Sequence, residues 1–384
     1  MNIVVGVIAV VVVLAAFGLL AVAFAAARSL VVGRSAQPIT YNRVGDHLEF
    51  ASTELTRAEG SYGLLALDGV HARIDAVLDE QGTTVTRRLG AVTGGLLPTR
   101  GEGRWVRDVY PTPAELGLSF TEVAIATAGG PSPAWLIPGS GGDDVWAIHL
   151  HGIRTTRSVV LPGASALLPT GVTSLVPSWR GDSEGPSIVG GGSSLGQEEW
   201  RDVEAALEFA VASGARSIVL VGWSMGAMIG ALLLQNSRLS DRVVGLVMVA
   251  PVTSWRTVVG HAMRAARLPA IVGPLVEGIL RTPGLCRLAA LSAPVRLRDL
   301  DSAATRVNVP TLVIHNPGDP IAPFAASVDF VNQNGEYAQL VVFEEAPHAM
   351  EWNREPQRFE ETMTHWVANV VAHDRAAAGE EDRP

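Results

Sequence analysis

The sequence predicts an α/β fold: a mostly parallel, doubly wound sheet with a helical lid insertion, preceded by a transmembrane helix and a small N-terminal region. From residue 144 onward, continuously apolar runs alternate with amphipathic stretches such as Glu198–Ala212 and Met225–Gln235. This alternation is typical of parallel strands that helices cover on both faces. The expected strands are Val145–Leu150, Val172–Val176, Ser217–Val221, Val243–Val249, Thr311–Ile314 and Leu340–Phe343.

Composition places the chain among folded proteins and excludes several kinds of chemistry. Of 384 residues, 48% are hydrophobic and 17% are charged, so the bulk of the chain is not disordered. The formal net charge is −9 and the longest basic cluster is Arg87-Arg88, which argues against nucleic acid as a partner. All 29 basic residues are arginine, so no lysine can form a Schiff base. Cys286 is the single cysteine, so an intrachain disulfide is excluded. We interpret it as a small apolar residue in a helix.

The amino terminus carries a long apolar segment. Ile3–Ala27 contains no charged residue, and as a helix it is long enough to cross a bilayer core of about 30 Å. A cleaved signal peptide is the alternative, because Ala21–Ala23 and Ala23–Ala25 offer small-x-small sites. The segment exceeds the usual apolar length of a signal peptide and no basic residue precedes it. We therefore predict an uncleaved single-pass anchor over residues 1–28.

Basic residues near this segment indicate its orientation. Arg28, Arg34 and Arg43 follow it, and none precedes it. The positive-inside rule then places the body of the protein on the cytoplasmic side.

Composition divides the rest of the chain into three segments, the second of which contains an insertion. Residues 29–115 are predicted to be a linker and a small β-rich region, because short apolar stretches there are broken by glycine. Residues 116–376 hold the α/β domain, which begins with a hairpin around Gly129-Gly130-Pro131. Within it, the apolar, proline-interrupted stretch 253–307 is predicted to be the inserted lid. The charged residues 377–384 are expected to form a disordered tail.

The strongest chemical signal is Gly222-Trp223-Ser224-Met225-Gly226. It directly follows the predicted strand Ser217–Val221 and directly precedes a helical run. A serine on so sharp a strand-to-helix turn is lifted above the sheet, and flanking glycines allow the backbone to approach closely. This context predicts that Ser224 is a nucleophile, whereas the alternative is an ordinary turn serine.

A serine nucleophile needs a base and an acid, and both are available after later strands. Asp319 lies in the loop after Thr311–Ile314, and His348 lies in the loop after Leu340–Phe343. The carboxyl ends of parallel strands share one edge of a sheet, so these side chains can meet Ser224 there. His348 would accept the serine proton and Asp319 would orient the imidazolium. The alternatives are an Asx turn at Asp319 and an ordinary loop histidine at His348.

An oxyanion hole is the remaining requirement of this chemistry. One donor is expected to be the backbone N–H of Met225, which follows the nucleophile. The second is expected from the loop after Val145–Leu150, where Gly152 allows the N–H of Ile153 to approach the reacting carbonyl.

These motifs resemble those of the α/β-hydrolase superfamily, specifically bacterial membrane-associated members of the serine hydrolase or esterase kind. The resemblance covers about residues 119–372 and rests on His151-Gly152, Trp179-Arg180-Gly181-Asp182-Ser183, Gly222–Gly226, Gly318-Asp319 and Pro347-His348. It implies hydrolysis of esters or related acyl bonds with no cofactor and no metal. The superfamily also contains acyltransferases and inactive members, so the fold alone does not fix the reaction.

Three further features have competing interpretations. His149 and His151 alternate on one strand and face the same side, but no further ligand lies near them, so a metal pair is disfavoured. His315 precedes Asp319 and breaks the expected order, which favours a packing role. In the helix Glu198–Ala212, the acidic residues of the first turn are expected to face solvent.

Three functions remain to be separated. The first is a membrane-anchored serine hydrolase that acts on a small-molecule or lipid-like ester. The second is an acyltransferase on the same triad, and the third is a non-catalytic membrane-anchored binding protein with the hydrolase fold. Acyl-chain length and substrate identity depend on pocket shape, which composition does not encode.

Overall fold

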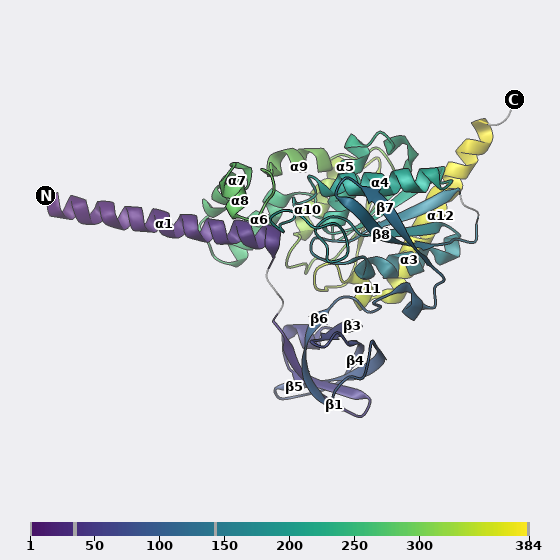
Figure 1. The fold of residues 1–384 in the computed structure, drawn as a ribbon, viewed down its shortest axis with the longest axis horizontal. Coiled ribbons are helices and arrows are strands. Elements are labelled where there is room, and N and C mark those ends of the chain that lie inside the picture. Colours follow the sequence, from purple (N-terminus) through teal and green to yellow (C-terminus); the bar gives the residue numbers. More distant parts are fainter. Residues whose placement is uncertain (1, 34–36, 142–143, 382–384) are drawn as a thin grey trace.

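The computed structural model describes residues 2–33, 37–141 and 144–381. Three parts are visible in Figure 1: a long N-terminal helix α1 (Asn2–Val32), a small β-barrel and a larger α/β body. The second of the three basic residues used to predict orientation, Arg34, lies outside the described residues.

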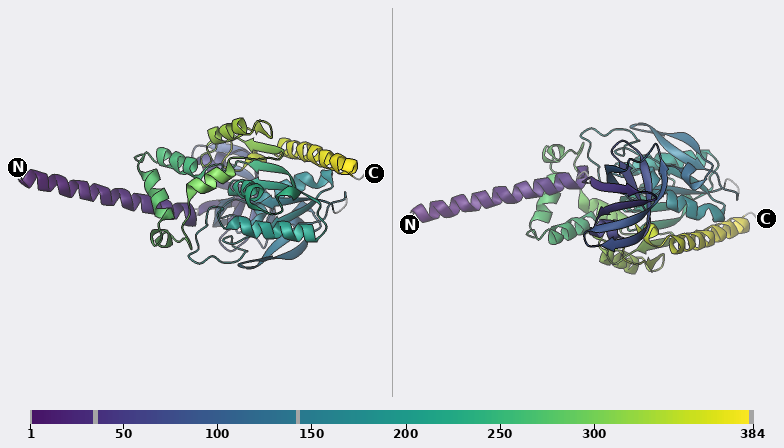
Figure 2. Two further views of the ribbon diagram at one scale, coloured as in Figure 1. Left: turned by 90° about the horizontal axis from the view of Figure 1, so that it is seen from above. Right: turned by 90° about the horizontal axis from the view of Figure 1, so that it is seen from below.

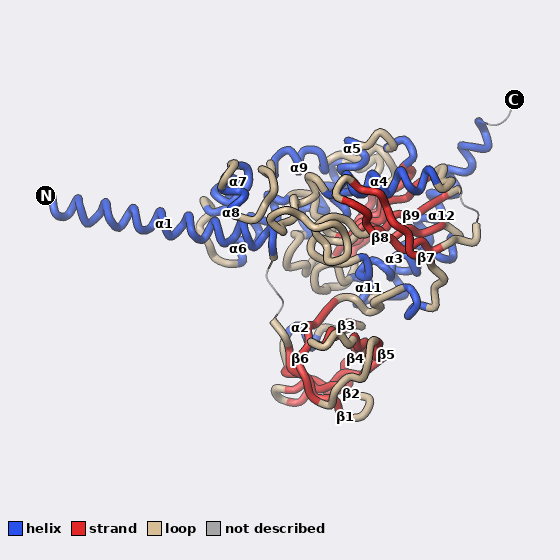
Figure 3. Tube along the Cα trace, viewed as in Figure 1, coloured by secondary structure: helices blue, strands red, loops and turns tan. Residues whose placement is uncertain are grey.

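The barrel consists of six antiparallel strands closed in the order β1-β2-β5-β4-β3-β6. Figure 3 shows them as a ring of strands set apart from the main sheet. They are β1 (Ile39–Val44), β2 (His47–Ala51), β3 (Tyr62–Ala66), β4 (His71–Gln81), β5 (Thr84–Thr93) and β6 (Arg100–Val106), with a short helix α2 (Glu54–Arg57). The segment predicted as linker and small β-rich region is thus mostly barrel, and its first strand begins at Ile39.

A buried arginine fastens α2 to this barrel. Arg87 is fully buried, and its guanidinium donates to the backbone oxygens of Thr56, Ala58, Gly60 and Asp75. A buried charge is tolerated only when its donors are satisfied, and here backbone carbonyls take that role. This bonding fixes the segment that ends at Gly60.

The main sheet has eight strands in the order β14-β13-β12-β11-β9-β10-β8-β7. The strands from β10 to β14 along this order are parallel, and the β7–β8 hairpin adds antiparallel strands at one edge. Their bounds are β7 (Thr121–Thr127), β8 (Gly130–Ile137), β9 (Val145–Leu150), β10 (Thr173–Pro177), β11 (Ser217–Trp223), β12 (Val243–Val249), β13 (Thr311–His315) and β14 (Ala338–Val342). The predicted mostly parallel, doubly wound sheet is confirmed.

Helices cover both faces of the sheet, each over its own apolar core. One core joins α4 (Glu199–Ala212), α5 (Met225–Asn236) and α10 (Phe324–Gln333) to the sheet, and the other joins α3 (Leu161–Leu167) and α12 (Pro356–Glu381). A short helix, α11 (Glu351–Arg354), precedes α12. Single 3₁₀ turns span Pro113–Leu116, Arg157–Val160, Leu168–Thr170 and Ser240–Arg242.

Two local predictions were wrong. In α4, Glu199 and Asp202 are 1% and 2% exposed rather than solvated. Glu199 accepts hydrogen bonds from the Ser193 hydroxyl and the backbone of the preceding loop, and Asp202 pairs with Arg180. At the C-terminus, α12 continues to Glu381 where a disordered tail was expected from residue 377; residues 382–384 lie outside the described range.

An insertion of four helices separates β12 from β13, where a lid over residues 253–307 was predicted. The helices are α6 (Trp255–Ala265), α7 (Val272–Arg281), α8 (Leu285–Leu288) and α9 (Leu297–Ala304). Cys286 is buried in α8, as its apolar interpretation requires. Both views in Figure 2 show these helices flanking the second half of α1, and α7 packs against it.

Candidate active site

Ser224 stands between β11 and α5 with φ +55°, a conformation that L-residues rarely adopt. The flanking glycines make this turn possible. A Cβ at Gly222 would overlap the backbone of Gly226 and Ala227, and a Cβ at Gly226 would overlap the Leu150 carbonyl. The strained turn therefore lifts the Ser224 hydroxyl to the carboxyl edge of the sheet.

Ser224, His348 and Asp319 form a continuous hydrogen-bonded chain. His348 Nε2 lies 2.8 Å from Ser224 Oγ, and His348 Nδ1 lies 2.6 Å from Asp319 Oδ2. Since Asp319 can only accept while ionised, Nδ1 carries the proton and Nε2 is free to accept from the serine hydroxyl. The three side chains come from loops after β11, β13 and β14, and all three are buried.

Asp319 is held by four hydrogen bonds. Its Oδ1 accepts from the amides of Ile321 and Ala322, and its Oδ2 accepts from His348 and from His315 Nε2 at 3.0 Å. Burial alone would raise the pKa of Asp319, but the bonds from His315 and His348 outweigh it and hold the pKa well below its ordinary value. Asp319 is therefore ionised throughout the physiological range.

The contact between His315 and Asp319 was not predicted from the sequence. His315 was assigned to packing because it precedes the acid, yet its Nε2 donates to Asp319 while its Nδ1 accepts from the Ser327 hydroxyl at 2.7 Å. The available signal was the spacing of four residues between His315 and Asp319 across a tight loop after a strand.

The environment of His348 keeps its imidazole neutral. Burial lowers the pKa of His348 more than the bond to Asp319 raises it. A histidine that stays unprotonated at neutral pH is suited to accept a proton.

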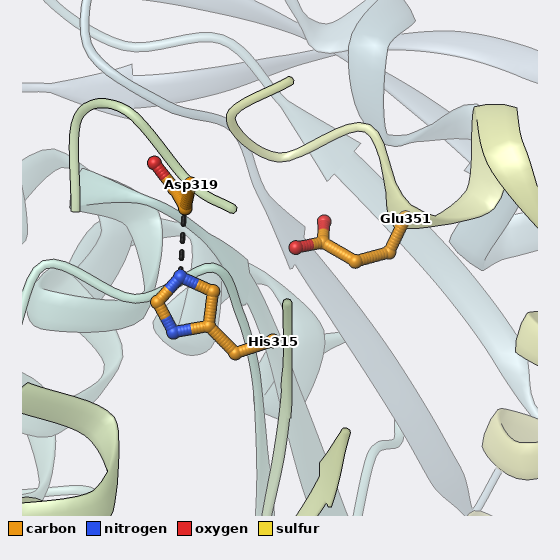
Figure 4. A group of neighbouring side chains, drawn as sticks. All are labelled: His315, Asp319 and Glu351. Atoms are coloured by element: carbon orange, nitrogen blue, oxygen red, sulfur yellow. Dashed lines mark hydrogen bonds and ion pairs between the residues drawn. The ribbon is translucent and has the colours of Figure 1, made fainter. Parts of the chain in front are cut away.

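Behind Asp319 lies a second buried carboxyl group. Figure 4 shows Glu351 beside His315 and Asp319. One potential metal-ligand atom from each of the three lies within 4.8 Å of the others. Nearly all these nitrogen and oxygen atoms already make hydrogen bonds. Both His315 nitrogens and both Asp319 oxygens do so, and Glu351 Oε1 accepts from Asn316. A cation here would have to break the bonds of Asp319, so we interpret the cluster as a hydrogen-bond network.

Glu351 has one oxygen, Oε2, without a partner among the described residues, and burial raises the pKa of Glu351 from 4.5 to about 7. Between pH 4.5 and 7 the unfolded chain ionises this group and the folded chain does not, so folding loses stability as pH rises through that window. Glu351→Gln removes this cost. The quantity to compare is the free energy of unfolding of the variant minus that of the wild type. We expect this difference to be larger at pH 8 than at pH 4 by up to about 3 kcal/mol. Urea unfolding of both proteins at the two pH values measures this; an equal difference at both would contradict it.

The loops predicted to form the oxyanion hole lie against Ser224. Strand β9 neighbours β11, so the loop after β9 reaches the same edge. A Cβ at Gly152 would lie 3.3 Å from Ser224 Cβ, which shows how closely that backbone passes. Met225 is the first residue of α5, so its N–H is one of those that have no intrahelical partner. Ile153 follows Gly152 and is partly buried.

His149 and His151 make separate contacts. His149 Nε2 lies 3.1 Å from Ser174 Oγ, and burial lowers the pKa of His149 to about 3. His151 stacks on Trp179 and bonds Asp182 at 3.0 Å, which ties the loop after β9 to the loop after β10. These contacts account for both histidines without a metal.

The barrel docks on the segment that carries His348. Ala346 and Met350, on either side of the histidine, are buried in the barrel's own core. Asn353 of α11 donates to the Ser61 carbonyl at 2.7 Å, and its carbonyl accepts from the Ser61 amide at 3.1 Å. The position of His348 therefore depends on contacts with residues almost 300 positions earlier.

Gly60 tests this dependence. A Cβ there would overlap the Asn353 carbonyl, so Gly60→Ala must push the barrel and the His348 segment apart. We expect kcat/KM to fall by about 100-fold, the effect of a displacement of about 1 Å. Gly69→Ala is the matched control, because Gly69 also has positive φ but open space at its Cβ. Equal activity of the two variants would contradict the positioning role.

Comparisons with known proteins identify the fold of the chain. A model of the alpha/beta hydrolase family matches residues 136–362, more than half of the chain, and a model of a domain of unknown function (DUF8805) matches residues 41–106, the barrel. No curated protein matches the chain. Together with the sheet order and the turn at Ser224, the first match defines the class of protein.

A solved esterase structure shows the same fold. The Pyrococcus furiosus esterase Pf2001 shares 19% identity, with a TM-score of 0.52 over 68% of this chain and 96% of that one. The structure of ferulic acid bound to Est1E from Butyrivibrio proteoclasticus gives 17% identity and a TM-score of 0.48 over 65% and 99% of the two chains. The chain belongs to the alpha/beta hydrolase family, and the barrel and α1 are additions to the shared fold.

Proposed function

We propose that this protein is a serine hydrolase that cleaves an ester or related acyl bond through Ser224, His348 and Asp319. The observation that carries the proposal is the unbroken hydrogen-bonded chain from Ser224 Oγ to Asp319 Oδ2 at a strained strand-to-helix turn. The esterase named among the solved structures supports the fold, and the chemistry rests on these contacts.

The reaction proceeds in two halves. His348 Nε2 takes the Ser224 proton as Oγ bonds to the substrate carbonyl carbon, and the carbonyl electron pair moves to oxygen. When the intermediate collapses, the bond to the alkoxide breaks, and this leaving group takes the proton from His348. Water then attacks the acyl-enzyme with His348 again as base, which releases the acid and restores Ser224. Asp319 stays ionised and stabilises the imidazolium.

Backbone donors stabilise the negative charge on the carbonyl oxygen. We assign this role to the N–H groups of Met225 and Ile153, with Gly152 allowing the close approach. Preorganised donors of this kind contribute about 3 to 4 kcal/mol each in acyl transfer.

The insertion acts as a lid in this proposal. Ser224 is only 4% exposed, so a substrate reaches it when a covering segment moves. Val252, which leads into the insertion, donates its amide to the Ser224 carbonyl, so movement of α6 is coupled to the site. The apolar faces of these amphipathic helices favour a lipid-like ester.

The helix α1 is a retained membrane anchor in this proposal. Within the described residues it is the one helix long and apolar enough to cross a membrane, over Val7–Val32. Ala23, Ala27 and Val31 are fully buried against the body, and the Val31 carbonyl accepts from Ser193. Signal cleavage near Ala25 would remove part of this packing, and the positive-inside rule places the body in the cytoplasm. The intact mass of the membrane-extracted protein tests retention: it should equal that of the full chain.

A substrate panel separates the three candidate functions. The full chain in detergent should hydrolyse p-nitrophenyl esters, with the chain-length optimum reporting the acyl pocket. Product analysis with added alcohols distinguishes hydrolysis from acyl transfer. A protein that is intact and binds esters without turnover at any chain length would support the non-catalytic alternative and contradict the proposal.

A further inference from the structure

The insertion carries a charge opposite to that of the chain. Residues 253–307 contain eight arginines and three carboxylates, although the whole chain has a formal net charge of −9. Two ion pairs join Arg256 to Glu277 and Arg296 to Asp299. Arg264, Arg267 and Arg287 are exposed and have no carboxylate partner among the described residues. The insertion is therefore a net-positive segment of an acidic protein.

Exposed apolar side chains accompany these arginines. Ile271 is 53% exposed, Leu285 is 40% exposed and Leu288 is 66% exposed. We call the six residues the outer patch: Arg264, Arg267, Ile271, Leu285, Arg287 and Leu288. Large exposed apolar residues interspersed with arginine are typical of surfaces that lie in a membrane interface.

The outer patch lies on helices that flank the part of α1 packed against the body. Helix α7 packs on α1, α6 and α8 contact α7, and Arg28 of α1 donates to the Leu288 carbonyl at 3.5 Å. The most N-terminal α1 side chain packed against the body is Leu19, whereas Val4 and Phe17 are 64% and 68% exposed. The free part of α1 is thus about 20 residues, or roughly 30 Å, which matches the bilayer core. A membrane that α1 crosses would meet the insertion where that core ends.

We propose that the outer patch docks on the anionic lipid leaflet adjoining α1, with arginines on headgroup phosphates and Ile271, Leu285 and Leu288 in the interface. The partner follows from charge complementarity and from the continuity of the patch with α1. This docking holds the lid at the membrane surface. Anionic lipid is concentrated in the cytoplasmic leaflet, the side on which the body is placed. The inference rests on the proposed anchor but not on the proposed chemistry.

Amide hydrogen exchange on the full chain in nanodiscs tests this docking. One disc contains only phosphatidylcholine, and the other contains phosphatidylcholine with phosphatidylglycerol. In the anionic disc, exchange over residues 264–271 and 284–288 is expected to be about tenfold slower than in the neutral disc, with no change in α10. The variant R267Q/R287Q should lose most of this difference.

The control variant is R216Q/R242Q. Both residues are exposed arginines before the amino ends of β11 and β12, at the sheet edge opposite Ser224. It should behave as wild type. Equal exchange in both discs, or equal behaviour of the two variants, overturns the inference alone. Failure of the chain to enter either disc overturns the anchor and the inference with it, and protection that grows with protein concentration would assign the patch to a second copy instead.

Discussion

Replacing Ser224 by alanine is expected to lower kcat for ester hydrolysis by about 10⁵- to 10⁶-fold. The hydroxyl is the only atom of the proposed triad that bonds to substrate, so its loss leaves only binding and the oxyanion donors. The fold should persist, because alanine fits the same space and the hydrogen bond that is lost joins Ser224 Oγ to the proposed catalytic partner His348. Steady-state kinetics and thermal unfolding of the variant measure both expectations.

Ser132→Ala is the matched control for this variant. Ser132 is also buried, and its hydroxyl donates to the Ser178 carbonyl at 2.8 Å. It lies in strand β8, far from the triad in the chain. Its loss should affect stability but not kcat. If Ser224→Ala retained wild-type turnover while Ser132→Ala behaved as expected, another residue would have to be the nucleophile.

Asp319→Asn is expected to lower kcat by about 10⁴-fold. Asparagine keeps the shape of the side chain, but its amide cannot hold the imidazole in the tautomer that leaves Nε2 free to accept. His315→Gln leaves the bond between His348 and Asp319 in place, so we expect a loss of only about tenfold.

The pH dependence separates orientation from general damage. Without the carboxylate, nothing offsets the burial that lowers the pKa of His348, so its titration should move further down in Asp319→Asn. Imidazole resonances in NMR report this directly. A loss as large in His315→Gln as in Asp319→Asn would show that the network as a whole, and not the orienting carboxylate, sets the rate.

The sheet and the convergence of Ser224, Asp319 and His348 could be predicted because their signals are local. A continuously apolar run reports burial on both faces of a strand, and glycines around Ser224 report a backbone with no room for Cβ. The loop positions of Asp319 and His348 followed from the rule that strand ends share an edge. Boundaries moved by only a few residues, as at β14, which begins at Ala338 instead of Leu340.

Other features depend on contacts between distant residues and were missed for that reason. Glu199 was expected to be solvated because it opens an amphipathic helix, but a loop that folds over it supplies its donors. The closure of the barrel and its docking on Asn353 require pairings that no local pattern encodes. The role of His315 depended on a loop geometry that spacing alone leaves open.

The central claim is that Ser224 is a nucleophile activated by His348. Labelling with a fluorophosphonate, followed by peptide mass spectrometry, tests it most directly. The account predicts one covalent adduct on the peptide that contains Ser224, strongly reduced in His348→Ala and absent in Ser224→Ala. An unlabelled wild-type protein that is folded, or equal labelling of Ser224→Ala, would contradict it.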